Sequence, residues 1–216
     1  MPDQVSRADF KARSNWSRAT ASALLAMAAT VLSGCGSVPL APTRLDSISD
    51  YTYQIGPGDN LNIVIWRNPE LSSSVPVRPD GMITTPLVED IKATNKTPTQ
   101  LAREIEKALT KYIQDPIVTI IVTGFVGPYS EQIRIVGQAA RPQTLPYRQN
   151  MSVLDVMISV GGLTDFAAGN RATILRTGEG STQYRVRLND LLQKGDVSAN
   201  VDMRPGDVLI IPESYF

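Results

Sequence analysis

Two stretches of the sequence place Pro-Gly-Asp directly before an apolar run, although more than half of the chain separates them. They are IGPGDNLNIVI at residues 55–65 and MRPGDVLIIP at residues 203–212. In the first, Leu61, Ile63 and Ile65 alternate with neighbours of mostly polar character, which predicts a half-buried strand. The continuous apolar run at 208–211 predicts a fully buried strand. The fold must therefore accommodate a turn that starts a strand at both places.

The residues of these turns are the first candidates for structural motif positions. They are Gly56, Pro57, Gly58 and Asp59 in the first stretch and Pro205, Gly206 and Asp207 in the second. Proline presets its own backbone angle, glycine tolerates a positive φ, and aspartate bonds to nearby backbone amides. A third turn, made of Pro79, Asp80 and Gly81, lies between two candidate strands at 75–78 and 82–85 and predicts a β-hairpin.

The clearest helix signal begins at Thr97. This residue can act as the N-cap, Pro98 suits the first helical position, and Gln100 completes a capping box. The apolar residues that follow share one helical face: Leu101, Ile105, Ala108, Leu109 and Tyr112. We expect the helix to end near Ile113, before an Asp-Pro pair, and a β-branched strand to follow at 117–123.

The second half of the chain repeats this mixture of strands and a capped helix. Strands are expected at 132–136, 144–145, 172–176, 184–186 and 208–211, and one helical turn at 188–192. Ser152 and Asp155 resemble a second capping box, and Gly161 and Gly162 should stop the helix that it opens. The strands at 172–176 and 184–186 are expected to pair across residues 178–180. The sequence therefore predicts an α+β fold of two small modules in series.

Composition excludes most catalytic chemistry. The 216 residues contain no histidine, which removes a Ser-His-Asp triad and any histidine-bound metal. The 21 basic and 21 acidic residues balance, so no basic field exists to attract nucleic acid. An enzyme that uses a carboxylate pair is the remaining catalytic alternative, but no two acids stand out in a shared motif. We therefore expect a protein that is not an enzyme and has neither a metal nor a cofactor.

The only cysteine, Cys35, follows a segment typical of secretory signals. Lys11, Arg13 and Arg18 precede an apolar segment of 13 residues at 19–31, which is too short to span a bilayer comfortably. Leu32, Ser33 and Gly34 then lead into Cys35, as in the bacterial lipobox. The resemblance implies a signal peptide at 1–34, acylation of Cys35 and a tether at 35–50. Because Gly36 and not aspartate follows, it also implies sorting to the outer membrane of a Gram-negative bacterium, facing the periplasm.

Several motifs, taken in order, resemble those of the outer-membrane polysaccharide export (Wza-like) lipoproteins. YQIGPGDNLNIVIW at 53–66, RPDGMITTPL at 78–87, TPTQLAREI at 97–105 and YIQDPIVTI at 112–120 resemble the polysaccharide export domain. IRIVGQAARPQTLPY, SVLDVMISVGGLT and RPGDVLIIPES resemble the β-grasp-like (SLBB) module that follows it in that family. We accordingly expect a polysaccharide export domain at 51–128 and one SLBB module at 129–216.

The resemblance implies a non-enzymatic conduit for capsule or exopolysaccharide. Its expected partners are the polysaccharide polymer, further copies of the chain in a homo-oligomeric ring, and an inner-membrane co-polymerase of the chain-length-determinant type. Only five residues follow Ile211, whereas long family members continue into an amphipathic helix. A separate outer-membrane β-barrel is therefore expected to provide the exit.

The resemblance also gives the motif residues a second interpretation. We interpret Asp59 and Asp207 as turn residues, with a role toward sugar as the alternative. Asp80 and Gly81 should specify the hairpin, with a contact between subunits as the alternative. Trp66 is interpreted as a core residue and not as a stacking platform for sugar.

Two binding proteins are the rival interpretations. The stretch YQIGPGDNLNIVI shares the opening of a peptidoglycan-binding lysin motif, which should continue with a helix after Leu61. The alternating run predicts a strand there instead. The other rival is a lipoprotein sensor that binds a soluble sugar through its second module. Saturable affinity for a small ligand would favour the sensor, and a cross-linkable ring would favour export.

Overall fold

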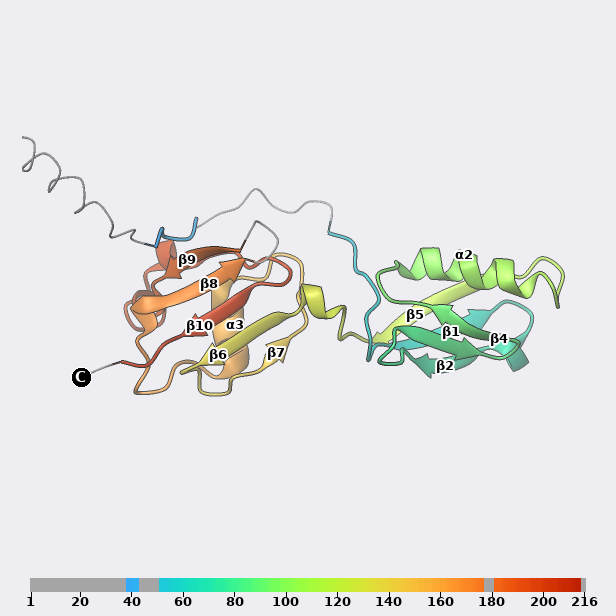
Figure 1. The fold of residues 1–216 in the computed structure, drawn as a ribbon, viewed down its shortest axis with the longest axis horizontal. Coiled ribbons are helices and arrows are strands. Elements are labelled where there is room, and N and C mark those ends of the chain that lie inside the picture. Colours follow the sequence, from blue (N-terminus) through green and yellow to red (C-terminus); the bar gives the residue numbers. More distant parts are fainter. Residues whose placement is uncertain (1–37, 43–50, 177–180, 215–216) are drawn as a thin grey trace, which may run out of the picture. The chain divides into compact units, whose positions relative to one another are not determined.

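The computed structural model describes residues 38–42, 51–176 and 181–214 (Figure 1). The proposed signal peptide, Cys35 and the turn at 178–180 lie outside these residues. The first module contains β1 (Asn60–Ile65), β2 (Ser73–Pro76), β3 (Met82–Thr85), β4 (Val88–Lys92), α2 (Pro98–Leu109) and β5 (Val118–Gly124). The second contains β6 (Ile133–Gly137), β7 (Thr144–Leu145), α3 (Val153–Val160), β8 (Ala172–Arg176), β9 (Thr182–Val186), α4 (Leu188–Gln193) and β10 (Val208–Ile211).

The first module is an antiparallel sheet covered on one face by a helix. Its three strands lie in the order β2-β1-β5, and α2 packs across β5 (Figure 1). The alternation in β1 has the predicted effect, because Leu61, Ile63 and Ile65 are buried. They pack with Leu101 and Ile105 of α2 in one apolar cluster. The covered face of the sheet is thus the core of this module.

Helix α2 begins as predicted and ends earlier. Thr97 and Gln100 form both bonds of the capping box, with Pro98 at the first helical position. The helix stops at Leu109, and the chain continues in turns toward Asp115, which has a positive φ of 47°. Placing Tyr112 on the apolar face was wrong, since this side chain is 58% exposed. The predicted pattern ran into the turn after the helix, where Ile113 still packs against the core but Tyr112 points away from it.

The predicted hairpin around Pro79, Asp80 and Gly81 is also corrected. The turn itself forms, since the amide of Gly81 donates to the carbonyl of Arg78 at 2.8 Å. However, β2 pairs with β1, and β3 pairs with β4, a strand that the sequence analysis missed. The turn therefore carries the chain from one sheet to another. Apolar runs on both sides of a turn show that strands are present, but not that they pair with each other.

Trp66 is exposed, contrary to the core interpretation. Its amide donates to the carbonyl of Ile117 at 2.9 Å, which prolongs the ladder between β1 and β5 by one residue. Since Ile65 faces the core, the next side chain must face the opposite way. Trp66 is accordingly 63% exposed, on the same uncovered face of the sheet as the exposed Val64 and Ile121.

The second module is a five-stranded mixed sheet in the order β7-β6-β10-β8-β9. The last strand, β10, lies between β6 and β8, parallel to the former and antiparallel to the latter. It is buried on one face through Leu209 and Ile211, which join Val153, Val156 and other residues of α3 in the second apolar cluster. With two sheet-and-helix cores, the fold is α+β, as the sequence predicts.

A short segment that precedes the first module in sequence contacts the second module. The amide of Ala41 donates to the carbonyl of Arg185 at 3.0 Å, and the amide of Arg185 donates to the carbonyl of Pro39 at 2.8 Å. Leu40 thereby forms a parallel bridge to Arg185 on the outer edge of β9. Backbone groups of an edge strand are open to such pairing. Residues 39–41 thus cover part of the edge of the second sheet.

Candidate functional site

Asp59 is the most fully bonded of the predicted turn residues. Its carboxylate is buried and accepts four hydrogen bonds. One oxygen, Oδ2, takes the amide of Gly56 at 2.9 Å and the hydroxyl of Tyr53 at 2.5 Å. The other, Oδ1, takes the amides of Val126 and Gly127 at 2.7 and 2.9 Å. Burial, together with the bond to Asp59, raises the pKa of Tyr53, so the phenol remains a donor.

The start and the end of the first module are packed backbone to backbone beside this carboxylate. A Cβ atom on Gly56 would lie 2.0 Å from the carbonyl carbon of Gly127, which no real contact allows. Glycine is required at position 56 because of this close approach and not because of its φ. Asp59 therefore connects the turn before β1 to the segment that follows β5. Both of its carboxylate oxygens are used for bonds within the protein, so the side chain is not available to a ligand.

Asp207 occupies the corresponding turn of the second module. Its Oδ2 accepts the amide of Arg204 at 2.9 Å and Nε of Arg176 at 3.3 Å, and both ionic side chains are almost fully buried. Arg176 also donates to the carbonyl of Asp202 at 2.8 Å and lies over the ring of Tyr184. Burial raises the pKa of Asp207 in spite of the hydrogen bonds and the guanidinium. This is a structural ion pair in the interior of the module.

The third turn lies on the surface. Arg78 forms ion pairs with Asp80 and with Asp90, the latter at 2.7 Å, and the three side chains are half-exposed or more. The amide of Met82 donates to Asp80, which lowers the pKa of that carboxyl. Gly81 has a positive φ of 81°. Whether this turn meets another subunit stays a prediction.

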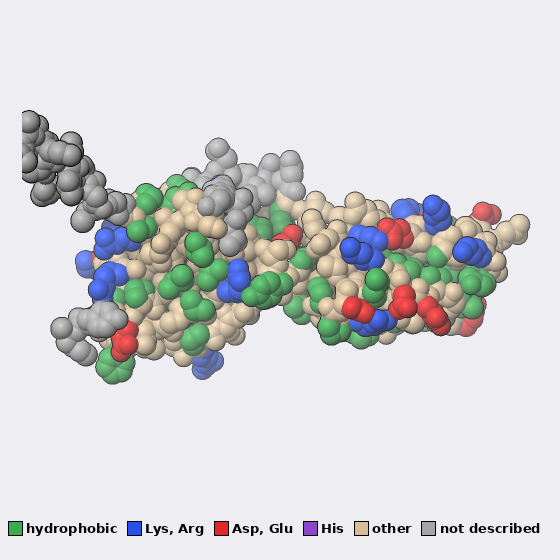
Figure 2. Space-filling view, in the orientation of Figure 1, with side chains coloured by type: hydrophobic (Ala, Val, Ile, Leu, Met, Phe, Trp, Pro, Cys, Tyr) green, Lys and Arg blue, Asp and Glu red, His purple; other side chains and the backbone are tan. Residues whose placement is uncertain are grey.

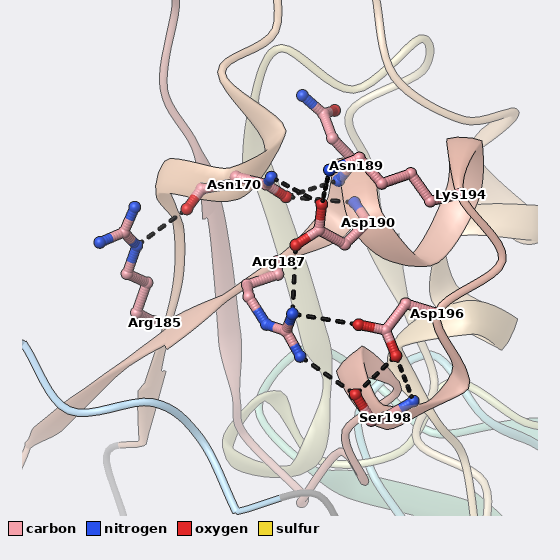
Figure 3. A network of polar contacts seen from close by, with 8 residues as sticks. All are labelled: Asn170, Arg185, Arg187, Asn189, Asp190, Lys194, Asp196 and Ser198. Carbon is pink, nitrogen blue, oxygen red and sulfur yellow. Dashed lines mark hydrogen bonds and ion pairs between the residues drawn. The ribbon is translucent and has the colours of Figure 1, made fainter.

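A fourth polar cluster, which the sequence analysis missed, surrounds Arg187 (Figure 3). The guanidinium donates to Asp190 at 3.2 Å, to Asp196 at 3.0 Å and to Ser198 at 3.1 Å. The side chain of Asn170 accepts the amides of Asn189 and Asp190 and so supplies the cap that Arg187, at the N-cap position of α4, does not provide. The carboxylates of Asp190 and Asp196 and the guanidinium of Arg187 all have partners within the module (Figure 3). The cluster therefore holds α4 to the two short helical turns Gly169–Arg171 and Val197–Ala199, which is a structural role.

The predicted turn residues thus do not converge on a common site. An open groove in the second module is the better candidate. It has a volume of about 380 Å³, which lies at the lower end of the range of ligand sites. It lies between the end of β7, the loop that follows and the first two turns of α3. Its lining residues are Leu145, Pro146, Arg148, Gln149, Asn150, Met151, Asp155, Ile158 and Ser159.

The groove combines an apolar floor with polar side chains. Ile158 is 69% exposed although it is apolar, and Leu145 and Pro146 are partly exposed. Asp155 uses one oxygen, Oδ2, for the capping box at Ser152, which lowers the pKa of its carboxyl and keeps it ionised at neutral pH. The capping box was visible in the sequence, but the groove was not. Its residues come together only when β7 and α3 pack on the same sheet.

Surface charge and metal ligands give no further site. Blue and red side chains are interspersed over the visible face, with uncharged surface between them (Figure 2). Within residues 38–42, 51–176 and 181–214, no three of the carboxylate or thiol side chains lie close enough to hold a metal ion. Over the same residues, no helix has the length and apolar character needed to cross a membrane.

Comparison with known proteins assigns both modules. Residues 47–123 match the family of polysaccharide biosynthesis/export proteins, and residues 131–211 match the SLBB domain. The EPS I polysaccharide export outer membrane protein EpsA of Ralstonia nicotianae is 25% identical over 185 residues, covering 74% of this chain and 47% of that protein. The exopolysaccharide production protein ExoF of Rhizobium meliloti is 26% identical, covering 74% of this chain and 40% of that protein. The chain therefore spans about half the length, or less, of these curated relatives.

Proposed function

The chain belongs to the polysaccharide export family, with one export domain followed by one SLBB domain, and from this premise we propose that it is part of the route by which a capsular polysaccharide or exopolysaccharide leaves the cell. The observation that carries the proposal is the order of the two matches, which are consecutive and together cover most of the chain. The names of the relatives, which include an outer membrane export protein, support the outer membrane as the place of action. We propose 51–128 and 129–216 as the limits of the two domains.

The proposed role is non-enzymatic. The whole chain lacks histidine. The buried carboxylates of Asp59 and Asp207 are bonded to their own turns and to segments far away in the sequence. Burial and full bonding of this kind support a structural role, since a catalytic acid or base must reach its substrate. The lysin-motif rival is not supported, because residues after Leu61 continue as strand β1 and not as a helix.

Deletion of the gene tests the proposal. Cells without the protein should synthesise the polymer but release much less of it, so polymer should fall in the medium and rise in the cell-associated fraction. Expression of the intact chain from a plasmid should restore release. Normal release from the deletion strain, with the two domains verified to be absent, would contradict the proposed function.

We further propose that the protein is held at the outer membrane by lipid on Cys35. Replacement of Cys35 by serine should remove the site of acylation and leave the precursor uncleaved. It should also shift the protein out of the outer-membrane fraction, because the acyl chains on this residue supply the stable attachment. Processing is read from electrophoretic mobility and anchoring from a carbonate wash. Cys35→Ala is the matched second variant. Normal processing with retention in the membrane would show that the anchor is not on this cysteine.

The proposed assembly is a closed ring of identical subunits that passes the polymer from an inner-membrane co-polymerase toward an exit protein in the outer membrane. Heterologous contacts between copies close into rings when the rotation permits it. We expect sedimentation of the detergent-solubilised protein to show one discrete oligomer, stabilised by cross-linking. A strictly monomeric protein in detergent, and also together with the co-polymerase, would argue against the ring.

A further inference from the structure

The groove between β7 and α3 has polar groups that the fold itself does not use. Arg148 and Asn150 are exposed, and their side chains form no hydrogen bond with the part of the chain that the structure describes. Asp155 accepts bonds at Oδ2 only, so its second oxygen, Oδ1, has no partner among the same residues. A cation, an amide and a carboxylate oxygen among the lining residues thus have no partner in the part of the chain that the structure describes.

The backbone of Asn150, one of the lining residues, has an unusual and well-defined conformation. Its φ of 62° is left-handed, a region that residues other than glycine rarely adopt, although asparagine tolerates it better than most. A turn fixes it, since the amide of Met151 donates to the carbonyl of Arg148 at 3.0 Å. Three consecutive lining residues, 148–150, are therefore held between two fixed ends, β7 and α3.

The free groups match the bonding pattern of a sugar hydroxyl. A hydroxyl group is both a donor and an acceptor. It can donate to the Asp155 carboxylate, accept from Arg148, and do both with the Asn150 amide. The apolar floor of Leu145, Pro146 and Ile158 suits the C–H face of a pyranose ring. The carboxylate of an acidic sugar would lie between one cation, Arg148, and one anion, Asp155. It would gain no net attraction to offset the loss of its hydration, so a neutral sugar fits better.

We propose that this groove is a contact site for neutral sugar residues of the polymer. This inference rests on the proposed function and adds to it the place of contact on the SLBB domain and the chemical class of the sugar. The groove is open and small, so the contact is weak and exchanges quickly. Such a site can guide a moving chain without retaining it.

Binding of defined sugars by the purified full chain in detergent tests the inference. The probes are neutral gluco- and galacto-configured oligosaccharides, the corresponding glucuronic acid derivatives, and fragments of the polymer that the source strain secretes. Saturation-transfer NMR should detect the neutral probes and the fragments, and the dissociation constant should be at least about fivefold lower for neutral than for acidic sugars. This ratio corresponds to about one hydrogen bond.

Two variants remove the free groups without disturbing the fold. Asn150→Gly deletes the amide and keeps the left-handed backbone, and Arg148→Ala deletes the cation. Each should weaken binding at least about fivefold. Arg141→Ala, an exposed arginine outside the groove, is the control and should bind as the unchanged chain does. Circular dichroism verifies the fold of every variant.

A charge on the apolar floor gives an independent test. Ile158→Asp should abolish binding. The control Val197→Asp should not, because it places the same charge on a valine that is 75% exposed elsewhere in the module.

Absence of binding to all probes, or equal binding by the groove and control variants, overturns the inference. Cross-linking of an Ile158→Cys variant through its new thiol to another protein chain in the intact assembly also overturns the inference. If the probes do not bind but the deletion strain fails to release polymer, the inference is wrong and the proposed function stands. If the deletion strain releases polymer normally, the proposed function itself is wrong.

Discussion

A chain in which Asp59 is replaced by alanine is expected to lose about 4 kcal/mol or more of the free energy of unfolding of its first module. The substitution removes the common acceptor of three backbone amides and the Tyr53 hydroxyl, all of which the native structure directs at this carboxylate. Each buried donor left without a partner costs about 1–3 kcal/mol. Since small domains are stable by only about 5–15 kcal/mol, the module should be largely unfolded in mild denaturant.

Hydrogen exchange measured by mass spectrometry can assign this loss to the right part of the chain. Peptides from β1, α2 and β5 should exchange much faster in the Asp59→Ala variant, and peptides from β6 and β10 should change little. Asp80→Ala is the matched control, because Asp80 is also a turn aspartate but is half exposed, and surface ion pairs contribute about 1 kcal/mol or less. Equal effects of the two substitutions would mean that the bonds to Asp59 do not support the module.

The second large effect is expected at Arg176. Replacement by methionine keeps much of the side-chain volume but leaves the Asp207 carboxylate buried without its cation. Removal of one partner from a buried ion pair typically costs about 3–5 kcal/mol. The loss of the bond to the carbonyl of Asp202 and of the contact with the ring of Tyr184 should add to it. The midpoint of urea unfolding of the second module should fall accordingly.

The cost of removing Arg176 should depend on pH in a definite direction. The folded-state pKa of Asp207 is already above its ordinary value of 3.8, because burial disfavours the charge. Protonation of Asp207 therefore stabilises the folded state relative to the unfolded state. This stabilisation is complete below the ordinary pKa of the unfolded chain, and it is lost as the pH rises through the folded-state pKa. Without Arg176 that pKa rises further. The Arg176→Met variant should thus be less destabilised at pH 4 than at pH 7, and an equal or larger loss at pH 4 would contradict this account.

Features set by neighbouring residues could be predicted from the sequence. Both capping boxes, at Thr97 and at Ser152, form with the expected partners three residues later. The alternation of Leu61, Ile63 and Ile65 gave the correct buried face of β1. The same alternation would have placed Trp66 outside, had it been applied one residue further in preference to the general tendency of tryptophan to be buried. Local periodicity was the more reliable guide at this position.

Features set by distant residues could not be predicted. Nothing in the apolar run at 208–211 indicates that β10 lies parallel to β6, because pairing of strands far apart depends on the packing of the whole module. The partner of β2 was missed for the same reason. The cap that Asn170 supplies to α4 comes from another part of the chain and leaves no signal at Arg187. The groove also depends on tertiary packing, since its walls come from β7 and α3.

The pairing of Leu40 with β9 has a consequence for how the chain is made. Residues 39–41 and Tyr51 precede the first module, yet Ala41 and Tyr51 pack against the core of the second, where the ring of Tyr51 meets that of Tyr147 at 5.0 Å. The chain therefore contacts the core and the sheet edge of the second module before it forms the first sheet. On a ribosome that adds about 5–20 residues per second, the leading segment waits several seconds for its partner strand to emerge. Because Asp59 bonds the amide of Gly56 and those of Val126 and Gly127, the chain enters and leaves the first module side by side, so this module can close on itself while the leading segment still waits.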